Sequence, residues 1–446
     1  MTGVTPLQPI LGLDPAWVSG TILVIAYAVI MTEKLNRAVV AGVGACLMVL
    51  VGVLTQDEAI AGIDLNTIGL LTGMMLIVGV TKKTGLFQYI AIRCAQVTGG
   101  SPAATLGLLA LATAVFSALL DNVTTVLLVV PVTLAVTKQL EVPPFPFLFA
   151  QVFASNLGGT STLIGDPPNI LIGSAADLTF NDFVLNTGIP VVIAIGVTGL
   201  IGHFVWARRM SATQAVRERV LALNARESIT DPRLLKGAMG VLLLTITAFV
   251  LARALGLEGG TIAMSGAALL ILFDNWRHDA EVQTQRVHAV LGELEWITLF
   301  FFIGLFVMVA GVERAGVLDR VADLLVRTTH GDPVKLMFAI LWGSALLSAV
   351  LDNIPFVATM IPVIQALAPD LGGTAALLPL WWALSLGACM GGNGTLIGAS
   401  ANITVAGLAE RAGTPFGFKR YTLPAFPLML VTLIICHIYL AWRFGR

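Results

Sequence analysis

Charged residues are scarce in this chain. Of its 446 residues only 11% are Asp, Glu, Lys or Arg, whereas 57% are hydrophobic, and the mean hydropathy is +0.90. Soluble domains carry about 25% charged residues, so a soluble protein of this composition would precipitate. The scarcity of charge therefore excludes a soluble globular protein and predicts a polytopic membrane protein. The net charge of −1 says nothing about nucleic acid, and no basic tract indicates a nucleic-acid partner, so we expect none.

The residues that usually hold metals, disulfides or nucleotides are also few. The four cysteines and five histidines are dispersed without a Cys-x-x-Cys pair, which argues against a disulfide framework, a structural zinc site or any cofactor. No G-x-x-x-x-G-K-[ST] motif occurs, and no soluble stretch is long enough to hydrolyse ATP. We therefore predict that the protein is not an enzyme, and that an ion gradient or a partner ATPase drives any transport. The N-terminus has no basic region before its first apolar run, which argues against a cleaved signal peptide.

The most informative stretch is apolar enough for a membrane but cannot form a continuous helix. Residues 154–174 read ASNLGGTSTLIGDPPNILIGS, in which glycines and two consecutive prolines interrupt the helix. The pattern recurs 233 positions later, because residues 391–403 (GGNGTLIGASANI) match residues 158–170 (GGTSTLIGDPPNI) at most positions. Broken apolar segments at matching places in two halves are the best sequence indication of a transporter's binding site.

The rest of the chain is duplicated in the same way. Gly73, Gly85 and Asp121 have identical residues 231 positions later. Each half also contains an apolar run, at residues 102–137 and 336–367, that is too short for two spans and is interrupted by an Asp-Asn pair. Both runs predict a re-entrant hairpin with the Asp-Asn pair at its tip.

We therefore predict an all-α polytopic membrane protein of two inverted repeats. Each repeat has five transmembrane helices, one of them broken, and a re-entrant hairpin. The first repeat covers residues 1–207, a linker covers 208–236, and the second repeat covers 237–446. The broken helices are expected at about 145–175 and 377–409. The other spans are expected at 18–31, 39–54, 66–80, 189–206, 240–255, 261–273, 296–312 and 423–442, with surface amphipathic segments at 85–97 and 315–327.

The basic residues orient these repeats in the membrane. Because each half has an odd number of crossings, the second half is inverted relative to the first, and Lys and Arg should gather on the cytoplasmic side. The side that holds the linker and the loops near residues 34, 82, 274–295 and 410–420 has 18 of the 25 Lys and Arg residues. The other side has Arg253, Arg314, Arg320, Arg327, Lys335, Arg443 and Arg446. We therefore predict a protein of the cytoplasmic membrane with a cytoplasmic linker and both termini outside.

The hairpin tips and broken segments form the candidate site. Non-helical backbone at membrane depth exposes carbonyls and helix N-termini, which bind cations and polarised oxygens respectively. The predicted substrate-binding residues are Asn122, Thr124, Asn156, Gly159, Thr160, Ser161, Thr162, Asn169, Asn353, Asn393, Thr395 and Asn402. Carboxylates are costly at this depth, so we predict a proton- or cation-coupling role for Asp121, Asp166 and Asp352. Helix capping is the alternative role for these three, and it is compatible with ion binding. Cys389 is interpreted as a small buried apolar residue.

These motifs resemble the ion transporter superfamily. More narrowly, the hairpin tips and the Gly-Asp-Pro-Pro-Asn segment around Asp166 resemble the branch of arsenite permeases and NhaD-type sodium/proton antiporters, which includes the melanosomal P protein. The resemblance covers essentially the whole chain. In the more distant sodium-dicarboxylate symporters the tips read Ser-Asn-Thr, whereas here they begin with Asp121 and Asp352. Ionised aspartates would repel a dianion and favour protons, sodium or a neutral polyhydroxy solute such as arsenous acid.

The resemblance implies a secondary active transporter that exports arsenite or antimonite in exchange for protons, with Asp121 and Asp352 as the leading proton carriers. It also implies an elevator mechanism, in which hairpins and broken helices slide against a scaffold that often forms a homodimer. A sodium/proton antiporter and an anion transporter of the carboxylate type are alternatives on the same fold. A channel or membrane scaffold protein is a further alternative, and the inverted repeats argue against it because alternating access explains that symmetry.

Overall fold

The protein is a bundle of helices. The computed structural model describes residues 12–32 and 34–445, and within these ranges every regular element is a helix. Eight of the helices are long and apolar enough to cross a membrane, and shorter apolar helices accompany them. The predicted class, an all-α polytopic membrane protein, is thereby confirmed. The outer positions predicted for the N-terminus and for Arg446 concern residues outside the described ranges.

The elements follow the duplicated order that the sequence predicts. The first half contains α1 (Pro15–Met31), α2 (Arg37–Leu50), α3 (Gln56–Ala61), α4 (Leu65–Lys82), α5 (Leu86–Val97), α6 (Pro102–Leu119), α7 (Asn122–Gln139), α8 (Phe145–Thr160), α9 (Pro167–Ala176) and α10 (Phe180–Val205). Between the halves lie η2 (Ala207–Arg209), α11 (Gln214–Leu221) and η3 (Ala225–Ser228). The second half contains α12 (Pro232–Val250), α13 (Ala252–Leu255), α14 (Gly259–Asn275), α15 (Ala280–Leu291), α16 (Trp296–Arg314), α17 (Val317–Thr329), α18 (Pro333–Ser348), α19 (Asn353–Ala366), α20 (Ala368–Leu371), η4 (Thr374–Leu377), α21 (Leu378–Gly391), α22 (Ser400–Arg411) and α23 (Phe418–Phe444).

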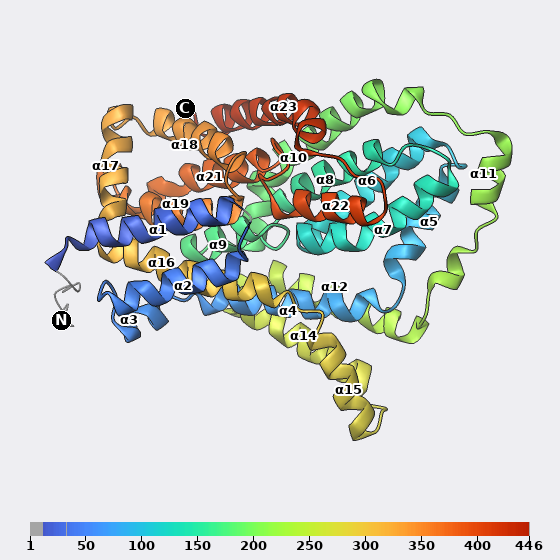
Figure 1. The fold of residues 1–446 in the computed structure, drawn as a ribbon, viewed down its shortest axis with the longest axis horizontal. Helices are drawn as coiled ribbons and strands as arrows, with labels where there is room; N and C mark the ends of the chain where they lie inside the picture. Colours follow the sequence, from blue (N-terminus) through green and yellow to red (C-terminus); the bar gives the residue numbers. More distant parts are fainter. Residues whose placement is uncertain (1–11, 33, 446) are drawn as a thin grey trace.

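The long helices lie roughly along the longest axis of the molecule (Figure 1). The short helices α3 and α17 lie at one end of this axis, α5 and α11 lie toward the other end, and α15 projects from the lower side of the bundle (Figure 1). The hairpin of α18 and α19 lies toward the first end, and the hairpin of α6 and α7 lies toward the second (Figure 1). The two hairpins therefore reach the middle of the bundle from opposite ends.

Helix starts recur at constant spacing between the halves. The helices α4, α5, α6 and α7 begin 231 positions before α16, α17, α18 and α19, and α8 and α9 begin 233 positions before α21 and α22. The glycines that precede α5 and α17 share a backbone conformation, since Gly85 and Gly316 both have positive φ, at 78° and 71°. Only glycine adopts this left-handed conformation without strain, which explains why the same residue stands at both places. The division of the chain into two inverted repeats stays a prediction.

Three helices differ from the predicted boundaries. The helix α10 begins at Phe180 rather than at residue 189, because Thr179 and Asp182 form a capping box and the helix accommodates Pro190 internally. The helix α12 begins inside the predicted linker 208–236, because Asp231 caps its first turn and a proline follows. The expected charged loop 274–295 contains the helix α15. In α12 and α15 charged side chains interrupt the apolar pattern, so this pattern does not indicate a helix there.

Two groups of helices can be distinguished by their contacts. We call α1, α2, α4, α12, α14 and α16 the scaffold helices, in which α2 packs along α16 and α4 packs along α14. We call α6 to α9, α18, α19, α21 and α22 the central bundle, in which each hairpin packs along a broken helix. These two pairs, α2 with α16 and α4 with α14, each join one half of the chain to the other, so neither half forms the scaffold alone.

Glycines permit the closest scaffold contacts. A Cβ atom on Gly73 of α4 would clash with the backbone of Ala263 in α14, and one on Gly304 of α16 would clash with the backbone of Ala41 in α2. Gly73 and Gly304 are 231 positions apart, so both helix crossings place a glycine at the equivalent position against the backbone of the facing helix. Small residues that let helix backbones approach are typical of helix packing in membranes.

Gly73→Ala should therefore destabilise the scaffold. The added methyl group meets backbone rather than a flexible side chain, so a helix must shift, at a cost of about 1–3 kcal/mol. The matched control is Gly196→Ala in α10, where a Cβ meets nothing within 4 Å. Thermal unfolding of the detergent-solubilised protein should show a lower transition temperature for Gly73→Ala and an unchanged one for Gly196→Ala. Equal transition temperatures for Gly73→Ala and the wild type would contradict the close contact.

Candidate functional site

Each broken helix is held open by one asparagine. The Asn169 amide nitrogen of α9 donates to the carbonyl oxygens of Thr160 (3.1 Å) and Thr162 (2.9 Å), in the segment that follows α8. The equivalent Asn402 of α22 donates to the carbonyl oxygens of Gly392 and Thr395, both at 2.8 Å. Backbone carbonyls without helical partners are costly in an apolar environment. These two side chains therefore stabilise both breaks in the same way.

The breaks are fastened to the hairpins by a duplicated set of hydroxyl groups. Thr162 Oγ1 donates to the Ala118 carbonyl oxygen at 2.6 Å, near the end of α6. In the second half Thr395 Oγ1 donates to the Ala349 carbonyl oxygen at 2.5 Å. Two further hydroxyl groups, 231 positions apart, donate from a hairpin to a broken helix: Ser117 to Ser155 and Ser348 to Ala388. Each hairpin and its broken helix are thus one hydrogen-bonded unit.

Buried amides join the two units across the middle of the molecule. Asn156 of α8 accepts from Asn122 (3.1 Å) and donates to the side-chain oxygens of Asn393 (3.0 Å) and Asn402 (2.9 Å). All four asparagines are at most 3% exposed. Tyr421 of α23 donates its hydroxyl to the Asn393 carbonyl oxygen at 3.2 Å, and the Asn393 amide nitrogen has no partner. The network brings together predicted site residues from both hairpin-bound units.

Cys389 takes the place of Asn156 in the second half. It stands 233 positions after Asn156 and lies 3.7 Å from the Asn169 side-chain oxygen, which also accepts from Ser385 at 2.7 Å. Asn156 makes the corresponding contact with Asn402. The thiol is 1% exposed, in agreement with its interpretation as a small buried residue.

The three predicted carboxylates have different surroundings. Asp121 caps α7 by accepting from the Thr124 backbone nitrogen at 2.8 Å, and Asp352 caps α19 by accepting from the Ile354 nitrogen at 3.1 Å. Asp166 stands at the N-cap position of α9 but makes no capping bond. Among the described residues neither of its carboxylate oxygens has a hydrogen-bond partner, and the residue is 1% exposed. The expected capping alternative therefore describes Asp121 and Asp352 but does not describe Asp166.

The remaining predicted residues lie nearby, and most of their polar groups bind local backbone. The hydroxyls of Thr160 and Ser161 donate to Asn156 and Gly158 carbonyl oxygens of their own helix. Thr124 is half-buried, Asn353 is buried at the second tip, and Gly159 packs against the carbonyl of Gly165. Within the described residues no group of three His, Cys, Asp or Glu side chains is arranged to hold a metal ion.

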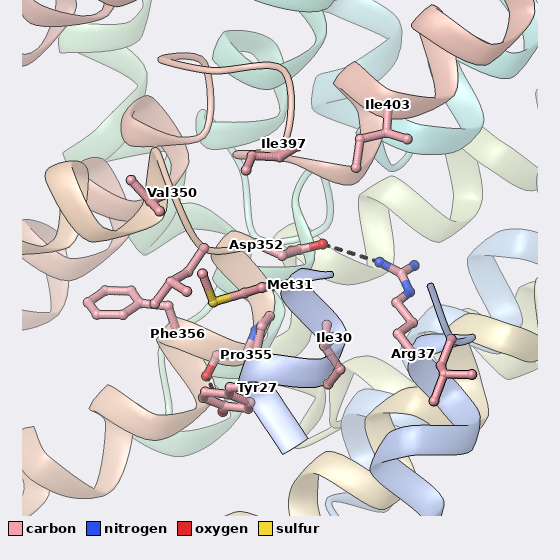
Figure 2. A pocket seen from close by; sticks show the side chains of 12 residues that line it. Tyr27, Ile30, Met31, Arg37, Val350, Asp352, Pro355, Phe356, Ile397 and Ile403 are labelled. Atoms are coloured by element: carbon pink, nitrogen blue, oxygen red, sulfur yellow. Dashed lines mark hydrogen bonds and ion pairs between the residues drawn. The ribbon is translucent and has the colours of Figure 1, made fainter. Parts of the chain in front are cut away.

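Arg37 is a site residue that the sequence did not reveal. Its guanidinium group forms an ion pair with Asp352 at 3.2 Å (Figure 2). It also donates to Ser400 Oγ at 2.7 Å. The pair borders a pocket of about 290 Å³ whose other walls are mainly apolar, among them Tyr27 and Phe356. In the sequence Arg37 is only one of the basic residues of the loop near residue 34, and nothing in its local sequence distinguishes it from the others. Its proximity to Asp352, 315 positions away, is set by the packing of α2.

Comparisons with known proteins identify one matching transporter family, similar sequences and a similar solved structure. The sequence profile of a family described as citrate transporter matches residues 27–387. An uncharacterized transporter of Mycobacterium tuberculosis (strain H37Rv) is 41% identical over 96% of this chain and 98% of its own length. The P protein of Mus musculus is 33% identical over 96% of this chain and 61% of its own length. The crystal structure of the YdaH transporter of Alcanivorax borkumensis has the same fold, with a TM-score of 0.59 and 15% identity over 97% of this chain and 98% of that one.

Asn156→Ala should weaken the central amide network. The substitution removes three side-chain hydrogen bonds and leaves buried partners unsatisfied, which costs about 1–3 kcal/mol. The matched control is Asn186→Ala in α10, which loses one bond to the Asp182 carbonyl oxygen of its own helix. Thermal unfolding in detergent should show a clearly larger decrease for Asn156→Ala. A decrease no larger than that of the control would mean that the network does not join the two units.

Proposed function

The chain belongs to the citrate transporter family of the ion transporter superfamily, and from this premise we propose that it exports arsenite or antimonite in exchange for protons. The observation that carries the proposal is Asp166, a carboxylate that is 1% exposed and has no hydrogen-bond partner on either oxygen. A bare carboxylate at this depth is unstable, so it holds a proton or a cation. Asp121 and Asp352 lie within electrostatic reach of Asp166 and complete the group of acidic residues.

The polar groups around Asp166 favour a neutral solute. Asparagine amides and hydroxyls dominate the middle of the central bundle, and among the described residues only Asp352 of the three aspartates has an ion-pair partner, the guanidinium group of Arg37. This excess of negative charge repels a di- or trianion. Arsenous acid is neutral near pH 7 and presents hydroxyl groups that amide and carboxylate oxygens can bind.

The proposed mechanism is an elevator. The central bundle carries the solute and the coupling ion, and it slides against the scaffold helices between the two faces of the membrane. The internal hydrogen bonds of the central bundle support its movement as one body. The protein acts in the cytoplasmic membrane as a homodimer, with linker 208–236 in the cytoplasm and both termini outside.

A sodium/proton antiporter on the same fold is the second candidate. Asp166 favours it equally, because an unpaired buried carboxylate serves Na⁺ as well as H⁺. A carboxylate transporter, the function in the family's description, is less compatible with this site, because coupling cations and Arg37 would have to offset three aspartates. A direct flux assay separates these functions.

The substrate can be tested with purified protein in liposomes that contain a pH-sensitive dye. Arsenite, antimonite, sodium and citrate are added separately, and empty liposomes are the control. Proton movement in response to arsenite and antimonite, and not to sodium or citrate, is the expected result. A response to sodium alone would favour the second candidate, and a response to citrate alone would contradict the argument from charge.

Asp166→Asn should strongly reduce coupled exchange without destabilising the fold. The neutral side chain of equal size removes the ion-binding carboxylate, so coupled exchange in the liposome assay should fall at least about a hundredfold. It also removes an unpaired buried charge, so the thermal unfolding temperature should be equal to or higher than that of the wild type. The matched control is Asp370→Asn, at an exposed position, which should change neither property. Wild-type exchange by Asp166→Asn would rule out Asp166 as the coupling residue.

A further inference from the structure

The two hairpin tips are alike in backbone structure and unlike in charge. Asp121 and Asp352 occupy the same N-cap position, 231 residues apart, and each accepts a hydrogen bond from its own helix. Of the two, Asp352 alone forms an ion pair among the described residues, and its partner is Arg37. The two tips, alike in backbone, therefore differ by one charge, the guanidinium group beside the second tip.

Arg37 has no basic counterpart in the other half. The glycine contacts of the scaffold make Ala41 of α2 equivalent to Ala263 of α14. The residue four positions before Ala263, which corresponds to Arg37, is Gly259. The first turn of α2 thus places a guanidinium group beside the second tip, and the first turn of α14 has no such group to place beside the first tip.

The guanidinium group is anchored on the scaffold side. Its Nη2 atom donates to Thr298 Oγ1 at 3.1 Å, and its central carbon lies 5.2 Å from the ring centre of Phe301. Thr298 and Phe301 both belong to α16, which packs along α2. Glu295, at the start of α16, also lies within electrostatic reach of Arg37. A planar guanidinium group held in this way presents its remaining donors in a fixed direction.

The remaining donors reach the central bundle. Nη1 donates to Asp352 Oδ2 at 3.2 Å and to Ser400 Oγ at 2.7 Å, and Ser400 donates in turn to Asp352 at 2.8 Å. The other Asp352 oxygen accepts from the backbone nitrogen of Ile354. Both carboxylate oxygens of Asp352 therefore have hydrogen-bond partners, in contrast to those of Asp166. Figure 2 shows the ion pair between Arg37 and Asp352.

We propose that Arg37 is a tethered counter-cation, which occupies the place of the exchanged cation at Asp352 and is displaced when that cation binds. If the central bundle moves away from α2 with Asp352 ionised, both charges lose their partner, which is costly in a poorly solvated place. If Asp352 carries a proton or a cation, it can leave Arg37 without that cost. Arg37 is thus a positioning residue that permits the bundle to move only in the loaded state. The inference rests on the proposed function, in which carboxylates of the central bundle carry the exchanged cation.

The ion pair can be tested first without any transport measurement. Thermal unfolding is recorded in detergent for Arg37→Gln, Asp352→Asn and the double variant. We expect a non-additive result, in which the double variant is more stable than Arg37→Gln, because the single variant leaves Asp352 without its partner. The control cycle uses Arg219→Gln and Glu141→Gln, an ion pair whose side chains are 56% and 60% exposed, and should be additive. Additive effects in the Arg37 cycle would overturn the proposal.

The role in coupling is tested in liposomes. Without the competing guanidinium group the cation binds Asp352 more tightly, so Arg37→Gln should lower the cation concentration for half-maximal exchange about fivefold and also lower the maximal rate. Arg37→Lys, which keeps the charge but loses the planar fork that contacts Thr298 and Ser400, should restore only part of the wild-type behaviour. If the wild type exchanges cations and Arg37→Gln has the same half-maximal concentration, the role of Arg37 is wrong and the proposed function stands. A wild-type protein that moves no cation with any tested solute would overturn both.

Discussion

The structure depends on one constraint, which is that peptide groups at membrane depth need partners within the protein. Two chain segments leave helical geometry there, between α8 and α9 and between α21 and α22. Asn169 and Asn402 satisfy the carbonyls at these breaks, and Thr162 and Thr395 connect the breaks to the hairpins. The same side chains that make the breaks tolerable thus unite each hairpin with its broken helix.

A symmetric framework holds asymmetric chemistry. The backbone geometry of the breaks, the glycine contacts and the hydroxyl bonds occur twice at nearly constant spacing, whereas the surroundings of the acidic groups differ between the halves. Asp121 has a capping bond, Asp352 has a capping bond and a guanidinium partner, and Asp166 has neither. The position equivalent to Asp166 is Ala399, so the unpaired carboxylate also occurs once. Duplication supplies the scaffold of the site, and single substitutions make its two sides different in charge.

The contacts that hold the scaffold together differ in kind from the polar contacts that it makes with the central bundle, which accompany apolar packing of α16 on α19 and of α4 on α9. Close packing within the scaffold relies on glycines that face backbone, as at Gly73 and Gly304. On the side of the second hairpin, the scaffold holds the central bundle through polar contacts, from Arg37 to Asp352 and from Tyr27 to the Pro355 carbonyl oxygen at 2.8 Å. Polar contacts of this kind can be exchanged for contacts with an ion or with water, whereas interlocked backbones cannot.

The sequence by itself determined the membrane class, the duplication and the places of the breaks. These features depend on composition and on local backbone preference, which glycine, proline and apolar length express without tertiary contacts. It also indicated the asparagines and aspartates of the site, because polar side chains in apolar runs stand out. Only the tertiary structure distinguished the three aspartates and revealed Arg37. The state of a carboxylate depends on which atoms lie within hydrogen-bond distance, and the partner of Asp352 comes from a helix start 315 positions away that carries no local signal. The apolar pattern does not indicate the start of α12 or the helix α15 for a related reason, since charged residues interrupt it there and α12 begins directly after its capping residue Asp231.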